Sequence, residues 1–242
     1  MMRQLSTLSF ACATLAALVL PADAASSLQV APVRIDLPGG AAASKLTLSN
    51  GGDEPLQAQV RVFKWVQADG KDSLAETRDV VASPPMISLG AGKSNVIRVV
   101  RTAKSAIASE EAYRVFVDQL PSAPTKPASS VSFVVRYSIP VFFSPKNEKG
   151  PDLAWSVSAS QGQTILQVAN RGDSHFRIAG LSMKTAGGKV TSFSKGLVGY
   201  ALAGSTAKFV LKGSVKGARP GQKITITAEG NDSPIQVEAE FR

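Results

Sequence analysis

Two arginines stand in stretches that otherwise predict apolar β-strands. Arg34 lies within Val30-Ala-Pro-Val-Arg-Ile-Asp-Leu37, and Arg114 within Tyr113-Arg-Val-Phe-Val-Asp-Gln-Leu-Pro121. A charge buried in an apolar strand without a partner is costly, and a guanidinium can bind a carboxylate through two parallel hydrogen bonds. Three interpretations follow for each arginine: a strand edge with the charge in water, a partner carboxylate within the domain, or a paired cationic site for an external carboxylate.

Motifs for catalysis or metal binding are sparse. His175 is the only histidine, and no Gly-x-Ser-x-Gly elbow accompanies it, so a serine–histidine triad is not supported. A zinc site with two histidines is impossible, and carboxylate clusters with ligand spacing are absent from the sequence. The sequence therefore predicts a protein that is not an enzyme, with no cofactor and no metal.

Two short motifs invite functional interpretations but fit turns better. Gly90-Ala-Gly-Lys-Ser94 resembles the end of a phosphate-binding loop, yet Ile87 stands where the first glycine belongs, and a strand follows instead of a helix. Arg171-Gly-Asp173 follows Val168-Ala-Asn170, and Asn-Arg-Gly-Asp favours a tight turn between two strands. Both are expected to be structural.

The stretch from Val131 to Phe143 is an unusually long and apolar strand. Its odd-numbered residues share one face of the strand and form an unbroken apolar ladder. Pro140 cannot donate a hydrogen bond to a neighbouring strand, which favours an edge position there. Two interpretations remain: a core strand with Pro140 near its end, or an edge strand that pairs with another chain.

The rest of the chain also predicts strands, separated by turns rich in Gly, Pro and Asn. Lys146 to Pro151 is the best candidate for a linker. We therefore expect an all-β protein of two immunoglobulin-like β-sandwich domains, residues 25–145 and 146–242, with one large sandwich or barrel as the rival. The predicted strands are Leu28 to Leu37, Lys45 to Ser49, Leu56 to Val66, Val96 to Val100, Tyr113 to Leu120, Val131 to Phe143, Trp155 to Ala159, Thr164 to Ala169, Phe176 to Met183, Lys208 to Leu211, Lys223 to Glu229 and Ile235 to Phe241.

Residues 1–24 have the pattern of a cleavable signal peptide: Arg3, an apolar run from Leu8 to Leu20, and Ala22-Asp-Ala24. The apolar run is shorter than the roughly 20 residues that span a bilayer, so stable membrane insertion is not expected. The only cysteine, Cys12, falls inside this segment. The net charge of +9 suits acidic partners or a membrane surface, and export makes nucleic acid an unlikely partner.

Several stretches, in the same order, resemble the periplasmic pilus (fimbrial) chaperones of the chaperone–usher pathway, the PapD-like family. They span nearly the whole exported chain, and together they are far more specific than any one of them. They are Val33-Arg34-Ile35, Leu48-Ser-Asn50, Ser83-Pro-Pro85, Leu89-Gly-Ala-Gly92, Ile97-Arg98-Val99, Tyr113-Arg114, Leu120-Pro121, Val131 to Pro145 and Val168-Ala-Asn-Arg-Gly172.

The resemblance implies two immunoglobulin-like domains arranged as a boomerang. In this family the last strand of the first domain lends apolar side chains to a subunit that lacks its own final strand. Val131, Phe133 and Val135 match the donated positions, and Tyr137 and Ile139 continue the ladder.

In the same family, two cations hold the carboxylate at the end of the subunit. Arg34 matches one of them, whereas many members have a lysine where this chain has Pro140, within Ile139-Pro-Val-Phe-Phe-Ser-Pro145. This departure resembles the archaic, spore-coat-type branch, and Arg114 is the candidate for the second cation.

The expected function is that of a periplasmic chaperone. It would bind pilus subunits by donor-strand complementation and deliver them to an outer-membrane usher, and the free protein could also cap itself as a dimer. The alternative is a secreted two-domain adhesin or structural surface protein whose apolar strand is buried in its own core. The two differ at Val131 to Phe143, because a core strand would be paired on both edges.

Overall fold

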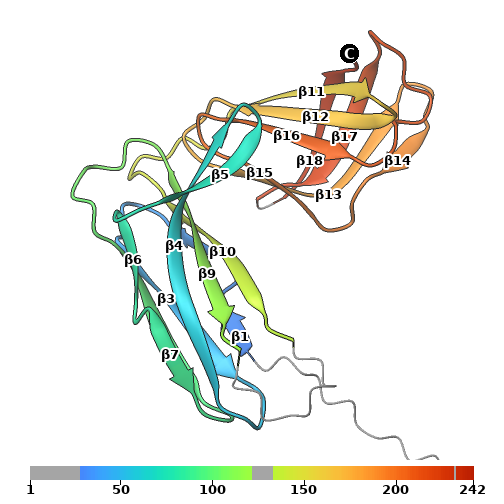
Figure 1. Ribbon diagram of the computed structural model, residues 1–242. Coiled ribbons are helices and arrows are strands. Elements are labelled where there is room, and N and C mark those ends of the chain that lie inside the picture. Colours follow the sequence, from blue (N-terminus) through green and yellow to red (C-terminus); the bar gives the residue numbers. More distant parts are fainter. Residues whose placement is uncertain (1–27, 122–132, 232) are drawn as a thin grey trace, which may run out of the picture.

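The computed structural model describes residues 28–121, 133–231 and 233–242, and every regular element within these ranges is a β-strand. Figure 1 shows two domains set at an angle to each other, like the arms of a boomerang. No helix in the described ranges is long and apolar enough to cross a membrane. The expected all-β fold with two sandwiches is confirmed, and residues 1–27, which include the expected signal peptide, lie outside the described part.

The first domain contains two sheets that face each other. One sheet has the order β1 (Leu28–Ala31), β3 (Ala43–Asn50), β8 (Ser94–Arg101), β6 (Val80–Ser83). The other has the order β2 (Ile35–Leu37), β10 (Arg136–Phe143), β9 (Glu111–Gln119), β4 (Leu56–Ala68), β5 (Lys71–Glu76), and β7 (Met86–Leu89) also pairs with β4.

The second domain repeats this two-sheet plan. Its first sheet has the order β11 (Leu153–Ser160), β12 (Gln163–Asn170), β16 (Thr206–Leu211). Its second sheet has the order β14 (Val190–Ser192), β13 (Phe176–Thr185), β17 (Lys223–Glu229), β18 (Pro234–Glu240), with β15 (Leu197–Ala201) also paired to β13.

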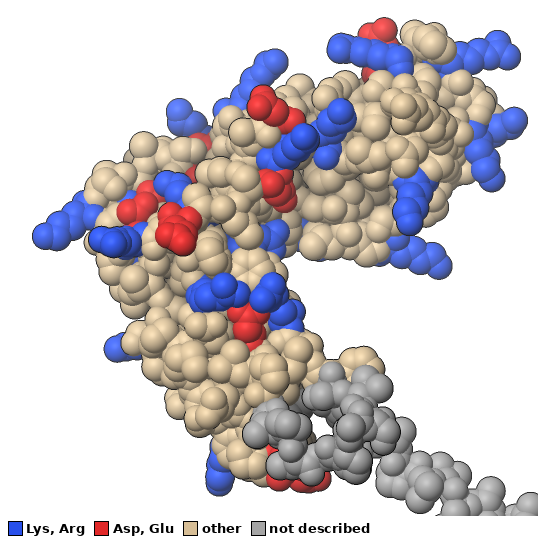
Figure 2. All heavy atoms as spheres, in the orientation of Figure 1, with Lys and Arg blue, Asp and Glu red and all other residues tan. Residues whose placement is uncertain are grey.

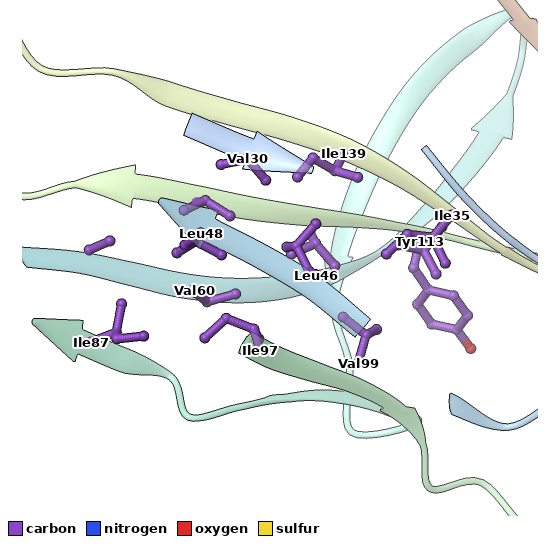
Figure 3. Packing of buried hydrophobic residues seen from close by; sticks show 14 of the residues in the cluster. Val30, Ile35, Leu46, Leu48, Val60, Ile87, Ile97, Val99, Tyr113 and Ile139 are labelled. Atoms are coloured by element: carbon purple, nitrogen blue, oxygen red, sulfur yellow. The ribbon is translucent and has the colours of Figure 1, made fainter. Parts of the chain in front are cut away.

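Each domain has its own hydrophobic core, built from the alternate residues that each strand turns inward. In the first domain, Leu46 and Leu48 of β3 meet Val60 of β4 and Ile139 of β10, so the core joins the two sheets (Figure 3). Because the two cores share no residue, each domain buries its own apolar surface.

A smaller apolar cluster joins the domains. It contains Trp65, Ala112 and Phe142 from the first domain with Tyr200 and Leu202 from the second. The Gln67 side chain extends this contact, because its Nε2 donates to the Tyr200 carbonyl at 2.8 Å and its Oε1 accepts from the Leu202 N–H at 2.8 Å.

The hairpin of β4 and β5 makes a second interdomain contact. At its tip, Gly70 forms an isolated bridge with Ala207. Gly70 has φ = 73°, and a Cβ there would lie 2.7 Å from the Cβ of Lys208. Only glycine therefore fits this close approach without a shift of one domain.

Two buried asparagines close equivalent turns in the two domains. The Asn50 Nδ2 donates to the carbonyls of Glu54 and Leu89, and its Oδ1 accepts from the Gly52 N–H. Asn170 does the same in the second domain with the carbonyls of Ser174 and Ala201 and the N–H of Gly172.

The expected turn at Arg171-Gly-Asp173 is therefore confirmed. A Cβ on Gly172 would overlap the Gly150 carbonyl, and the Asp173 carboxylate accepts the N–H groups of Lys149 and Gly150. The turn expected at Gly90 is also present, since the Lys93 N–H donates to the Gly90 carbonyl before β8 begins.

We predict that Asn50→Ala lowers the free energy of unfolding of the full chain by about 1–3 kcal/mol, because buried carbonyls lose their donor. Urea denaturation provides the measurement. Asn95→Ala is the matched control, since Asn95 is exposed, and we expect a change within about 0.5 kcal/mol. Equal denaturation midpoints for the two variants would contradict a structural role for Asn50.

Candidate functional site

One edge of β10 is open along most of the strand. On one side β10 pairs with β9 from Arg136 to Phe143. On the other side it pairs with β2 only from Val141 to Phe143, and no other described strand covers Arg136 to Pro140. The edge position expected at Pro140 is confirmed.

Because of the register of β10, Pro140 does not weaken the hydrogen bonds between β10 and β9. The Gln119 N–H donates to the Val135 carbonyl at 2.9 Å, so in this antiparallel pair the odd-numbered residues of β10 are those that bond to β9. Pro140 stands opposite Arg114 in a pair without backbone hydrogen bonds. Its missing N–H would have pointed to the open side, so the ladder with β9 loses nothing.

The predicted strand from Val131 to Phe143 is shorter in the structure, where β10 begins at Arg136 and the described residues 133–135 before it are not in a strand. The apolar ladder nevertheless continues from the interior of the domain along β10 to these surface residues. Ile139, at one end, is 2% exposed and belongs to the core. Tyr137 is half-buried, and its hydroxyl donates to the Leu28 carbonyl at 2.7 Å. Phe133 is 65% exposed, Val135 is half-buried, and Val131 lies outside the described residues.

The two candidate anchor arginines flank Pro140 on the outer face of the sheet. Arg114 is registered with Pro140 from β9. Arg34 immediately precedes Ile35, which is registered with Val141 in the parallel pair, so Arg34 stands beside Pro140 from the other side. Pro140 itself is buried. The fold thus brings together two arginines that are far apart in the sequence.

Arg114 is a partly buried cation held by aromatic rings. Its guanidinium carbon lies 3.7 Å from the centre of the Trp65 ring and 5.7 Å from that of Tyr200. Within the described ranges it makes no ion pair and no hydrogen bond through its side chain. Burial lowers the pKa of Arg114, yet an arginine remains charged at neutral pH. The charge of Asp72 acts on Arg114 without forming an ion pair with it in the described ranges, so the guanidinium can still bind an external anion.

Arg34 is less buried and has a local partner. Its Nε donates to the Asp36 carboxylate at 2.7 Å, and the two side chains are 34% and 41% exposed. An exposed pair two residues apart contributes little to stability, so the guanidinium can turn to another carboxylate at little cost. The partner expected within the domain exists for Arg34.

Further along the same face, Asp118 accepts hydrogen bonds from two arginines. Asp118 is 8% exposed and accepts hydrogen bonds from Arg61 and Arg136. Phe63 and Phe116 pack edge to face beside them, with ring centres 5.6 Å apart. Figure 2 shows cationic and acidic side chains together on this face of the first domain. The cluster ties β10 to β9 and β4 beside the open edge.

His175 proves to be structural, as its lack of catalytic partners predicted. It is stacked on Phe142 with ring centres 3.6 Å apart, and its Nδ1 lies 2.9 Å from the Glu110 carboxylate. Its backbone N–H also donates to Glu110. This buried contact links the two domains, since Glu110 belongs to the first and His175 to the second.

Nothing in the sequence indicated that Trp65, Glu110 and Tyr200 lie at this site. Trp65 lies in the predicted strand Leu56 to Val66, whereas Glu110 and Tyr200 lie in none of the predicted strands.

The comparisons with known proteins identify the family of this chain. Residues 27–149 match the model of the pili and flagellar-assembly chaperones, PapD N-terminal domain. The chain belongs to this family of pilus-assembly chaperones. The resemblance seen in the sequence is thereby confirmed, and the family favours a chaperone over a surface adhesin.

Relatives of this pilus-assembly chaperone support the assignment over most of the chain. The chaperone protein PmfD of Proteus mirabilis (strain HI4320) is 27% identical over 205 residues, which are 79% of this chain and 78% of PmfD. A chain in the CsuC–CsuE chaperone–tip adhesion subunit pre-assembly complex, from archaic chaperone-usher Csu pili of Acinetobacter baumannii, is 29% identical. The match covers 90% of this chain and 100% of that one, with a TM-score of 0.70. The E. coli chaperone DraB shares the fold at 23% identity and a TM-score of 0.57, over 89% of this chain and 97% of DraB.

The Asp118 cluster yields a prediction about acid stability. Burial of Asp118 opposes its charge, but hydrogen bonds from Arg136 and Arg61 outweigh this and lower its pKa. The charged carboxylate therefore stabilises the fold above the ordinary pKa of Asp, about 4, and this contribution is lost as the pH falls through the lowered value.

We expect Asp118→Asn to be less stable than the natural chain near neutral pH, with the difference shrinking in acid. Urea denaturation at about pH 7 and about pH 3 measures this. The exposed Asp53 provides the control variant, Asp53→Asn. Parallel pH profiles for Asp118→Asn and the natural chain would contradict the assigned role.

Proposed function

We propose that this chaperone captures pilus subunits by adding the stretch from Val131 to Val135 to them as an extra strand. The observation that carries the proposal is the open edge of β10, which leads to the half-buried Val135 and the exposed Phe133, both odd-numbered like the apolar ladder. An exposed apolar edge is normally a liability, so its presence favours pairing with another chain. The solved CsuC–CsuE and SafB–SafA complexes contain chaperones of this fold with their subunits.

The donated residues of this proposal are Val131, Phe133 and Val135. Ile139 is committed to the core of its own domain and Tyr137 is half-buried against it, so both continue the ladder as its fixed base. Covering an apolar groove on the subunit would contribute roughly 25 cal/mol per Å² of buried surface. The backbone of the open edge would add ladder hydrogen bonds.

The carboxylate at the end of the subunit is proposed to bind Arg34 and Arg114. The two arginines flank Pro140 at the end of the open edge, and Arg114 forms no ion pair among the described residues. An end-on anchor would fix the register of the added strand, because a slip by one residue would turn its apolar side chains to the wrong face.

The proposed place of action is the periplasm. The family and the expected signal peptide at residues 1–24 support a periplasmic protein that hands its subunits to an outer-membrane usher. Residues 25–145 and 146–242 are proposed as the two folding units, supported by their separate cores. The same open edge could let two free chaperones cap each other as a dimer. No enzymatic step is part of this function.

We predict that Arg34→Gln and Arg114→Gln each reduce the amount of co-expressed pilus subunit that co-purifies with the chaperone by about tenfold or more, because a desolvated carboxylate loses a charged partner. Arg98→Gln serves as the control, since Arg98 is exposed on the other sheet. Normal subunit yield with both anchor variants would sink the anchor assignment.

Replacing Phe133 by Asp is expected to abolish subunit capture, because a charge would have to enter the apolar groove. Phe133 is 65% exposed, so the variant should unfold at the same urea concentration as the natural chain. Val190→Asp places the same change at a position of the second domain that is 58% exposed, and should leave capture intact. If Phe133→Asp captured subunits normally, the donor-strand assignment would be wrong.

A further inference from the structure

Tyr200 of the second domain lies beside the proposed carboxylate anchor. It lies on β15 and is 5% exposed, with its ring packed edge to face on Trp65 at 5.4 Å between ring centres. The same ring lies 5.7 Å from the guanidinium carbon of Arg114. Trp65 therefore contacts both Arg114 and Tyr200, one from each domain.

The Tyr200 hydroxyl is available as a hydrogen-bond donor. Within the described ranges it has no hydrogen-bond partner. Its oxygen is not fully enclosed, so a group from outside can reach it. Burial raises the pKa of Tyr200, although the charges of Arg114, Arg34 and Arg177 oppose this. The phenol accordingly stays protonated at neutral pH and can donate to an anion.

Arg177 contributes a third positive charge from the second domain. It stands directly opposite Tyr200 in the pair of β13 and β15. Its Nη2 donates to the Gly230 carbonyl at 2.9 Å, which fixes the guanidinium, and its Nε is buried without a partner. No described carboxylate forms an ion pair with Arg177, so its charge is free to act on an anion nearby.

We propose that the carboxylate site spans both domains: the Tyr200 hydroxyl donates to the carboxylate held by Arg34 and Arg114, and Arg177 adds positive charge behind it. This inference rests on the anchor described under the proposed function. It makes the angle between the domains part of the binding site, because Tyr200 reaches the anchor only while the cluster of Trp65, Phe142 and Leu202 holds the domains together.

The test uses the full chain and a short synthetic peptide with apolar residues at alternate positions. The peptide is made with a free terminal carboxylate and, as a control, with a terminal amide. Titration calorimetry compares the two peptides on the natural chain, Arg34→Gln, Arg114→Gln, Tyr200→Phe and Arg177→Gln. Arg219→Gln controls for net charge, since Arg219 is exposed on the second domain.

We expect Tyr200→Phe to weaken binding of the acid peptide by about tenfold, the usual worth of a hydrogen bond to a charged group, and to leave the amide peptide unchanged. The ring remains, so a purely packing role would not separate the two peptides. Arg177→Gln should weaken the acid peptide by a smaller factor, and Arg219→Gln should not.

The outcomes distinguish the two levels of the proposal. If Arg34→Gln and Arg114→Gln remove the preference for the acid peptide while Tyr200→Phe and Arg177→Gln keep it, the anchor stands and the contribution of the second domain is refuted. If the natural chain shows no preference for the acid peptide, or keeps it in both anchor variants, the anchor itself is refuted.

Discussion

The register between β10 and β9 is the constraint on which the rest of the site depends. Because side chains alternate along a strand, fixing Val135 opposite Gln119 decides the direction of every later residue of β10. The odd-numbered residues enter the core, and the even-numbered ones face outward, where Pro140 lies between Arg34 and Arg114. One end of β10 thereby completes the core of its own domain, and the other end leads to the exposed Phe133.

Pro140 lets β10 pair with β9 on one side and keep its other edge open. A proline in the middle of a sheet would break a ladder, but here its nitrogen points to the side that β2 covers only from Val141 onward. It also fills the outer face between the two arginines without contributing a charge. The family resemblance led us to expect a cation at this position, and in our proposal Arg114 on the adjacent strand, supported by Trp65, takes its place.

The contact between the domains combines apolar packing with a few buried polar groups. Trp65, Phe142 and Tyr200 form its centre, and the pair of Glu110 with His175 and the two hydrogen bonds of Gln67 surround it. Buried polar groups are costly unless each is satisfied, so such an interface favours one arrangement of the domains over others. An anchor at this place would be sensitive to that arrangement.

The sequence by itself determined the all-β class, the alternation within the long strand, the turns at Gly90 and Arg171, and the motifs that resemble the chaperone family. These are local properties, fixed by strand periodicity and by the conformations that Gly, Pro and Asn allow. Only the tertiary structure decided that Arg34 and Arg114 flank one proline, that Ile139 belongs to its own core, and that Tyr200 of the other domain lies beside Arg114. Those relations arise from strand pairing and domain packing between residues far apart in the chain, which no local pattern encodes.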